Sequence, residues 1–172
     1  MEKPSIRFQD IGDDARRQYV DARATFEAQR AAQLKASAVR GGMYWKNVAQ
    51  GEYLVRTSVR NAQKSLGPRS AETEAMYASF TQRKQEAEAR LKDLSAALTR
   101  QQRLNRALFV GRVPALVVAL LDMLEQQGVA EHFTVVGTHA LYAYEAAAGV
   151  RVESAAVATR DVDLLWDTRK RF

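Results

Sequence analysis

The chain has 172 residues, 47% of them hydrophobic, which is enough for one ordinary domain or for a small domain with a helical extension. It contains no cysteine, so disulfides and thiolate metal sites are excluded, and we expect an intracellular, cytoplasmic protein. The start, MEKPSIRFQD, has no apolar core and predicts no signal peptide. The longest apolar run, VPALVVALLDML, is too short to span a bilayer, so we expect no membrane contact.

The net charge of +6 is unevenly distributed along the chain. Residues 1–110 carry 20 Lys and Arg against 12 Asp and Glu, whereas residues 111–172 carry 6 against 8. This asymmetry predicts two segments, a basic module at 1–110 that faces a polyanion and a segment at 111–172 with a different role. An ordinary basic surface would give the same imbalance.

The first third of the chain predicts a helix followed by a hairpin. Residues 12–38 have acidic residues at the start and a narrow apolar stripe, and Gly41-Gly42 ends this helix. MYWKNV and EYLVRTSVR are β-rich runs separated by AQG, which predicts a β-hairpin. A short third strand is possible around residues 64–66.

The predicted hairpin is rich in cations and aromatic residues. Cations bind phosphates and aromatic rings stack on unpaired bases, so the hairpin is a candidate nucleic-acid site. Its six cations are Arg40, Lys46, Arg56, Arg60, Lys64 and Arg69, and the selected nucleic-acid-binding candidates are Lys46, Arg56, Arg60 and Lys64. Tyr44, Trp45 and Tyr53 lie among them. The alternative is that Trp45 and Tyr53 form a small core against the next helix.

Residues 71–108 predict one long helix, with Ser70 as its N-cap. Its apolar positions recur in alternating steps of three and four, which is a heptad pattern that needs a partner helix. The seam consists of Tyr77, Phe80, Lys84, Ala87, Leu91, Leu94, Leu98, Gln101, Asn105 and Leu108. Two partners fit the pattern: the first helix, in an antiparallel pair, or a second copy in a helix-mediated dimer.

The last third predicts alternating helices and strands. GRVPALVVALLDMLEQQGV is a helix with Pro114 at its start and Gly128 at its end, and it is apolar on most sides, so we expect it to be buried. HFTVVG predicts a core strand, with His132 on the surface. THALYAYEAAAG predicts a short helix closed by Gly149, VRVES a strand or loop, and RDVDLLW a last, buried strand.

Two aspartates lie in the last predicted strand. Residues two apart on a strand point to one face, so Asp161 and Asp163 should lie side by side. Their repulsion favours a bridging cation, and Mg²⁺ prefers carboxylate oxygens together with water and substrate phosphates. Such a pair suits two-metal phosphoryl or nucleotidyl transfer. The alternative is a strand end whose aspartates pair with Arg160, Arg151 or solvent.

A strand–turn–helix unit precedes this strand in TVVGTHALYAYE. Gly137 allows close backbone approach, and Thr138 offers a hydroxyl at a helix N-terminus, where free N–H groups suit a phosphate. His139 follows and is a candidate nucleotide contact or a polar cap.

Together, VVGTHAL and TRDVDLL resemble the nucleotidyltransferase superfamily, and the longer sequence resembles a bacterial family of uncharacterised nucleotidyltransferase-fold proteins. The resemblance implies an α+β fold: a helical basic module with a β-hairpin, then the first half of a nucleotidyltransferase-type mixed α/β sheet. It also implies that Gly137 and Thr138 hold a nucleoside triphosphate and that Asp161 and Asp163 are the catalytic residues that bind Mg²⁺, with two ions in the complete site.

The sequence departs from this family pattern in two places. Thr138 stands where Gly or Ser is usual. No third carboxylate is in reach, because Asp167 is about 13 Å along the strand from Asp163, and the other nearby acids, Glu145 and Glu153, do not lie on a later strand. The chain also ends at RKRF, where the family continues, so we expect a C-terminally truncated fragment.

The implied reaction is Mg²⁺-dependent transfer of a nucleoside monophosphate from a nucleoside triphosphate to a hydroxyl acceptor, an RNA or a protein, held by the basic module. Two alternatives remain. One is a non-catalytic nucleic-acid-binding protein with a degenerate transferase fold. The other is an antitoxin-like partner that assembles through the helix at 71–108.

Overall fold

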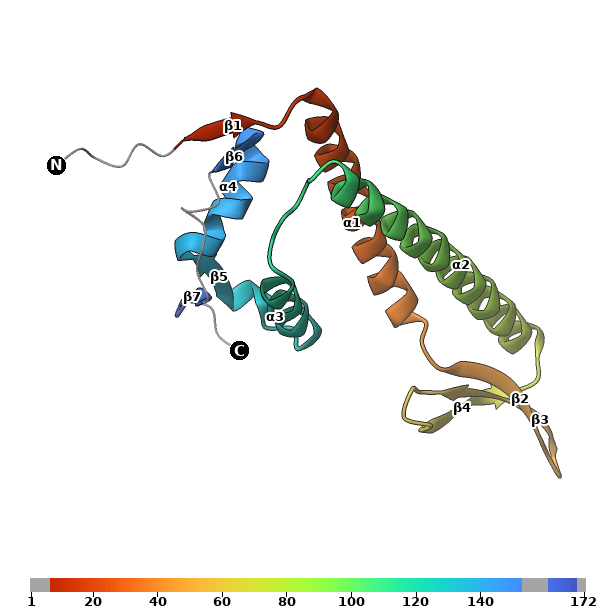
Figure 1. Ribbon diagram of the computed structural model, residues 1–172. Coiled ribbons are helices and arrows are strands. Elements are labelled where there is room, and N and C mark those ends of the chain that lie inside the picture. Colours follow the sequence, from red (N-terminus) through yellow and green to blue (C-terminus); the bar gives the residue numbers. More distant parts are fainter. Residues whose placement is uncertain (1–6, 153–160, 170–172) are drawn as a thin grey trace. The chain divides into compact units, whose positions relative to one another are not determined.

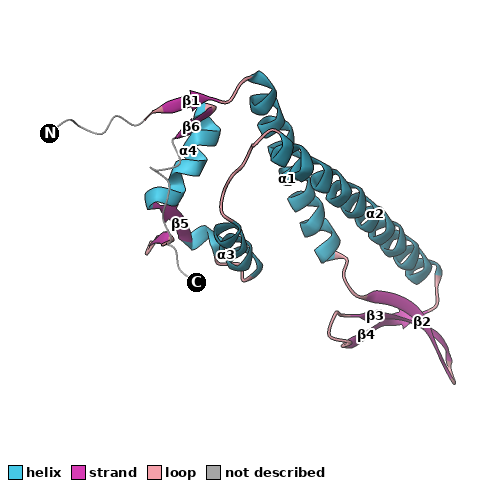
Figure 2. Cartoon of the chain, in the orientation of Figure 1, coloured by secondary structure: helices cyan, strands magenta, loops and turns pink. Residues whose placement is uncertain are grey.

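The computed structural model describes residues 7–152 and 161–169 (Figure 1). Its elements are β1 (Phe8–Asp10), α1 (Asp13–Ala38), β2 (Gly42–Val48), β3 (Gly51–Thr57), β4 (Gln63–Pro68), α2 (Ala71–Ala107), α3 (Ala115–Gln126), the 3-10 turn η1 (Ala130–His132), β5 (Phe133–Val136), the 3-10 turn η2 (Gly137–Ala140), α4 (Leu141–Ala148), β6 (Val150–Val152) and β7 (Asp163–Trp166). This mixture of helices and strands confirms the α+β class (Figure 2). Within the described ranges, no helix is both long and apolar enough to cross a membrane.

The chain divides into two compact units, which are described separately. One consists of Ala22–Gln101, and the other of Met1–Asp21 with Gln102–Phe172. The long helices α1 and α2 each begin in one unit and end in the other. The division into a basic module at 1–110 and a second segment at 111–172, predicted from the sequence, stays a prediction.

Helix α2 presents the seam that the heptad pattern predicts. The seam positions from Tyr77 to Asn105 are buried or half-buried, whereas Leu108 is exposed. Part of the cover comes from the same chain, since Gln18 of α1 donates a 2.8 Å hydrogen bond to Asn105 of α2, and Lys84 donates one of 2.7 Å to the carbonyl of Gly41. The antiparallel run of α1 and α2 agrees with the predicted intrachain pair (Figure 1).

The unit Ala22–Gln101 carries a three-stranded antiparallel sheet in the order β2–β3–β4. This confirms the hairpin and the short third strand. Trp45 lies opposite Leu54 in the β2–β3 register, and its ring centroid is 6.0 Å from that of Tyr77 on α2. Because Leu54 is fully buried, this face of the sheet is the local core, and Trp45 belongs to it.

The other unit carries two small antiparallel sheets, β1–β6 and β5–β7. β1 was not predicted, because its three residues are all exposed and show no hydrophobic alternation. Gly149 ends α4 in the left-handed conformation, as expected from the sequence.

Helix α3 begins after Pro114, but the expectation that it is buried is wrong. Only Val117 is buried in this helix, while Leu116 is 67% and Met123 53% exposed. Val117, Leu120 and Leu124 are the covered positions, at steps of three and four, so one narrow stripe of α3 packs against its own unit. Apolar composition predicted a helix but not how much of its surface is covered.

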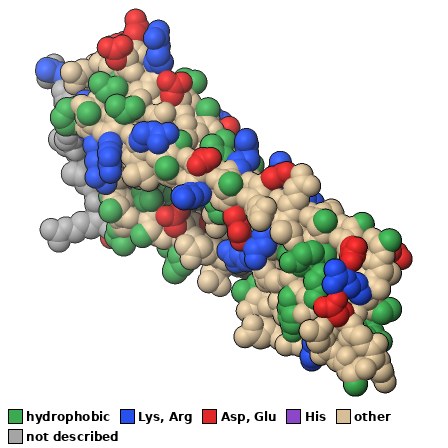
Figure 3. All heavy atoms as spheres, turned by 90° about the vertical axis from the view of Figure 1, so that its right-hand side faces the viewer, with side chains coloured by type: hydrophobic (Ala, Val, Ile, Leu, Met, Phe, Trp, Pro, Cys, Tyr) green, Lys and Arg blue, Asp and Glu red, His purple; other side chains and the backbone are tan. Residues whose placement is uncertain are grey.

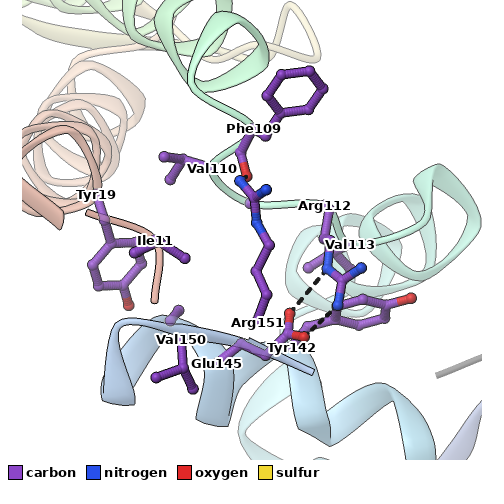
Figure 4. A pocket seen from close by; sticks show the side chains of 12 residues that line it. Ile11, Tyr19, Phe109, Val110, Arg112, Val113, Tyr142, Glu145, Val150 and Arg151 are labelled. Atoms are coloured by element: carbon purple, nitrogen blue, oxygen red, sulfur yellow. Dashed lines mark hydrogen bonds and ion pairs between the residues drawn. The ribbon is translucent and has the colours of Figure 1, made fainter. Parts of the chain in front are cut away.

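The C-terminus of α2 is closed by an unusual residue for that position. Phe109 has φ of 55°, a left-handed conformation that usually belongs to Gly, and the Val110 N–H donates to the carbonyl of Asn105 at 2.7 Å. Arg151 of β6 donates to the carbonyls of Phe109 (2.6 Å) and Leu108 (3.3 Å), and its guanidinium lies 5.6 Å from the Phe109 ring centroid (Figure 4). The contacts of Arg151 therefore stabilise a strained helix end.

Candidate functional site

The pairing of β5 with β7 brings the glycine turn and the aspartate strand together. Val136, the last residue of β5, lies opposite Asp163, the first residue of β7. Gly137 follows with φ of 66°, and an ideal Cβ on it would lie 2.3 Å from Oδ2 of Asp163. A side chain at position 137 would therefore push the exposed Asp163 carboxylate away from the turn, and the left-handed φ favours glycine at this position.

The two aspartates are exposed, so the expectation of a buried strand is wrong. β7 begins at Asp163, and Asp161 therefore precedes the strand. Exposure alternates along this stretch, with Val162 and Leu164 half-buried between exposed Asp161, Asp163 and Leu165. Because β7 has one neighbour, β5, in the described part of the sheet, much of its surface reaches solvent, and both carboxylates keep their hydration.

Asp163 makes no ion pair with any residue in the ranges 7–152 and 161–169. Arg151, one suggested partner, donates instead to the carbonyls at the end of α2. Arg160, the other suggested partner, lies outside the described residues. A carboxylate without a protein cation beside a glycine turn is open to a cation from solution.

Asp161 and Asp163 offer the kind of ligand that a magnesium ion prefers, because carboxylate oxygens are hard ligands and Mg²⁺ completes its coordination with water and phosphate oxygens. Among the described residues, no cluster of three or more His, Cys, Asp or Glu side chains could hold a metal ion. Mg²⁺ binding at Asp161 and Asp163 therefore stays a prediction.

Thr138 and His139 lie in the turn η2 between β5 and α4. Thr138 is half-buried, whereas His139 is only 6% exposed, and its ring lies 5.9 Å from that of Tyr142 in a stacked arrangement. Its Nδ1 has no hydrogen-bond partner among the described residues. Burial places His139 beneath the turn and not on its surface, and its contact with a nucleotide remains untested.

His132 is buried, so its predicted surface position is wrong. It is 4% exposed at the end of the turn η1, and its carbonyl accepts a 2.8 Å hydrogen bond from the Asp167 N–H. This bond extends the β5–β7 pairing beyond Phe133 and Trp166 and draws His132 inside. Neighbouring residues in the sequence gave no sign of this pairing.

An ion pair between half-buried Arg112 and buried Glu145, which sequence reasoning missed, connects three segments of this unit. Arg112, between α2 and α3, donates to both carboxylate oxygens of Glu145 on α4, and Nε is 3.1 Å from Oε2. Arg112 also donates to the carbonyl of Val152 (2.6 Å), and the Val152 N–H donates to Oε1 of Glu145 (2.7 Å). Figure 4 shows the two side chains pointing toward one another. Glu145 is thus committed to Arg112 and β6.

The charges of this pair stabilise one another. Burial raises the pKa of Glu145, but the hydrogen bonds from Arg112 and Val152 and the nearby positive charge outweigh it, so that the pKa is lowered overall. The hydrogen bonds that Arg112 donates to the Glu145 carboxylate raise the pKa of Arg112. Because the partners are 33 residues apart, no local motif could reveal the pair.

The basic candidates of the sheet differ in their surroundings. Arg56 donates to the carbonyls of Gly42 (2.9 Å), Thr57 (2.8 Å) and Arg40 (2.7 Å), and its guanidinium lies 4.3 Å from the Phe80 ring centroid. These contacts give Arg56 a structural part. Lys46, Arg60 and Lys64 are exposed. The role of all four in binding nucleic acid stays a prediction.

Arg69 differs from the other cations of the sheet segment because it is neutralised locally. It forms ion pairs with Glu52 and Glu74, and the hydrogen bond that it donates to the Glu52 carboxylate raises its pKa. On the face drawn in Figure 3, Lys and Arg side chains are interspersed with Asp and Glu. The mixed charge of this face therefore does not by itself indicate a phosphate-binding surface.

Comparison with known proteins bears on the turn and the aspartates. Residues 115–172 match a family described as Nucleotidyltransferase. The nucleotidyltransferase match covers about a third of the chain and includes Gly137, Asp161 and Asp163, whereas the basic sheet lies outside it. No curated protein and no solved structure is significantly similar to the chain. The match supports a nucleotidyltransferase-like function and a place in the nucleotidyltransferase superfamily for this segment.

Proposed function

We propose that the chain takes part in Mg²⁺-dependent transfer of a nucleoside monophosphate from a nucleoside triphosphate to a hydroxyl acceptor, an RNA or a protein. The observation that carries the proposal is the approach of Asp163 to Gly137, because it puts an exposed carboxylate beside the glycine turn that leads into α4. The nucleotidyltransferase match over the same residues supports it independently.

In this proposal the turn Gly137–Thr138 holds the triphosphate and the two aspartates hold magnesium. The ion, when bound, neutralises charge that develops on the transferring phosphate. The acceptor oxygen bonds to the α-phosphorus while the bond from that phosphorus to the β-phosphate oxygen breaks. Pyrophosphate leaves, and the acceptor proton passes to solvent. Asp161 and Asp163 would hold the ion beside the turn.

Calorimetric titration with a non-hydrolysable nucleoside triphosphate, with and without Mg²⁺, tests the nucleotide site. We expect binding that requires the ion and that is lost in Asp161→Asn/Asp163→Asn. The matched control is Asp122→Asn, which removes one carboxylate from an exposed position of α3. Absence of binding by the folded wild-type chain would exclude a working nucleotide site, and equal binding by the double variant would exclude the aspartates.

A further inference from the structure

The two faces of the β2–β3–β4 sheet have different side chains. Trp45 and Leu54 lie on the face that contacts α2, so Tyr44 and Lys46, the neighbours of Trp45 along β2, lie on the opposite face. In the register, Lys46 lies opposite Tyr53 and Tyr44 opposite Val55, which places the two tyrosines diagonally across neighbouring strands. We call this the outer face; it carries Tyr44, Lys46, Tyr53, Val55 and Ser65.

The outer face is hollowed. A cavity of about 430 Å³ is lined by Lys46, Tyr53, Val55 and polar side chains of Gln50, Gln63 and Ser65. Tyr44 is 38% exposed on the same face. A hollow with the ring of Tyr53, the apolar side chain of Val55 and a few hydrogen-bonding groups is suited to flat heterocycles, which stack on rings and form hydrogen bonds at their edges.

A second hollow lies at the end of the same sheet and shares Gln63 with the first. Its volume is about 380 Å³, and three cations line it: Arg40, Arg56 and Lys64. The other residues around it are neutral, with hydroxyl groups from Ser37, Thr57 and Ser58. Cations and hydroxyls without an acid among them suit a phosphate group.

Most cations around these hollows have no acidic partner. In the described part of the chain, Arg40, Lys46, Arg60 and Lys64 form no ion pair. Glu52 is the one acid of the sheet strands. It lies two residues from Leu54 and so shares the face of Leu54, opposite to the outer face, where it pairs with Arg69. Lys46 on the outer face, and Lys64, which lies opposite Arg56 at the end of the sheet, therefore have no neighbouring acid and suit a polyanion.

We propose that the outer face binds single-stranded nucleic acid, with bases stacked on Tyr44 and Tyr53 and a backbone phosphate at Lys46, and that the strand continues around the end of the sheet into the hollow of Arg40 and Lys64. Bases within a duplex are already stacked and shielded, so the rings favour a single strand. This site is distinct from the turn and aspartates of the proposed transferase site, and binding here needs neither a triphosphate nor Mg²⁺.

Fluorescence anisotropy with a labelled single-stranded RNA of about 12 nucleotides tests the proposal. The same sequence as single-stranded DNA and as a duplex supplies the comparison, in buffer without Mg²⁺. We expect binding of a single strand in preference to the duplex, and the two single strands distinguish RNA from DNA.

Tyr44→Ala should weaken binding about tenfold, whereas Tyr44→Phe, which keeps the ring, should bind like the wild type. Lys46→Ala should weaken binding and reduce the slope of log affinity against log salt by about one.

Matched controls separate the outer face from general charge and from folding. Tyr144→Ala removes an exposed tyrosine from α4, and Lys92→Ala removes an exposed lysine from α2; both should leave binding unchanged. Circular dichroism confirms that each variant is folded. Equal binding of duplex and single strand, or no effect of Tyr44→Ala in a folded variant, would overturn the proposal. Asp163→Asn should keep this binding, so a failure of the transferase site is distinguishable.

Discussion

The carboxylate of Asp163 occupies the space that a Cβ of Gly137 would take. An ideal Cβ would lie 2.3 Å from Oδ2 and 3.2 Å from Cγ of Asp163. Asp163 lies opposite Val136, the last residue of β5, and Gly137 follows Val136 as the first residue of the turn η2, so the β5–β7 register brings the two residues together. The glycine and the aspartate of the nucleotidyltransferase-like segment are therefore one geometric unit.

Gly137→Ala should abolish Mg²⁺–nucleotide binding, because the added methyl group moves the Asp163 carboxylate away from the turn. It should also lower the free energy of unfolding by about 1–2 kcal/mol, the strain of a left-handed alanine. Gly128→Ala is the matched control, since Gly128 has φ of 73° and nothing within 4 Å of an added Cβ. Urea unfolding should show a similar loss of stability in Gly137→Ala and Gly128→Ala. Calorimetry should show loss of Mg²⁺–nucleotide binding only in Gly137→Ala. Intact binding in Gly137→Ala would contradict this geometry.

Glu145→Gln should destabilise the fold at neutral pH by about 3 kcal/mol, since it leaves the Arg112 guanidinium without its counter-charge. The pKa of Glu145 is lowered in the fold below its ordinary value of 4.5. Its stabilisation is therefore fully present above that value and is lost as pH falls through the lowered pKa. Urea unfolding from pH 7 to pH 3 measures this dependence, which should be weaker in the variant. Glu88→Gln, at an exposed site on α2, should keep the wild-type slope.

Leu91→Asp with Leu94→Asp should unfold the α2 seam, because each change puts a charge at a half-buried position. The loss should be about 2 kcal/mol or more for each change. Ala89→Asp, at an exposed position of the same helix, should have little effect. Thermal melts followed by circular dichroism at two protein concentrations also distinguish the partners: an intrachain pair gives a constant Tm, and a dimer gives one that rises with concentration.

Phe109→Gly should raise the free energy of unfolding by about 1 kcal/mol, since glycine adopts the left-handed conformation without strain. The same change one residue earlier, Leu108→Gly, should be destabilising, because position 108 still donates to the carbonyl of Leu104 as a helical residue. Opposite signs at adjacent positions are easily measured by urea unfolding. A loss of stability in Phe109→Gly would show that the ring's contact with Arg151 outweighs the strain.

Local sequence patterns predicted the elements well. The heptad steps of α2 continue from Tyr77 to Asn105, so the covered seam followed from spacing alone. The hairpin followed from two β-rich runs around Ala49-Gln50-Gly51, and the turn at Gly137 from a β-branched run that ends in glycine. These features depend on neighbours within a few residues, which is the range that periodicity can report.

Contacts between distant residues were not predictable. The pair Arg112–Glu145 and the burial of His132 depend on segments that meet only in the fold. The burial expected for α3 was wrong for the same reason, because its apolar residues predict a buried surface only if some element covers it. The structure places Asp163 beside the Gly137 turn, and the exposure of Asp161 and Asp163 follows from the single neighbour that β7 has among the described strands.

The end of α2 depends on a residue that is made much later. Arg151 supplies hydrogen bonds to the carbonyls of Leu108 and Phe109 across 43 and 42 residues of sequence. During translation the chain emerges from its N-terminus, so α2 is complete while its final carbonyls still lack this partner. The C-terminal end of α2 can therefore form its hydrogen bonds with Arg151 only after β6 has left the ribosome, although the rest of the helix is synthesised much earlier.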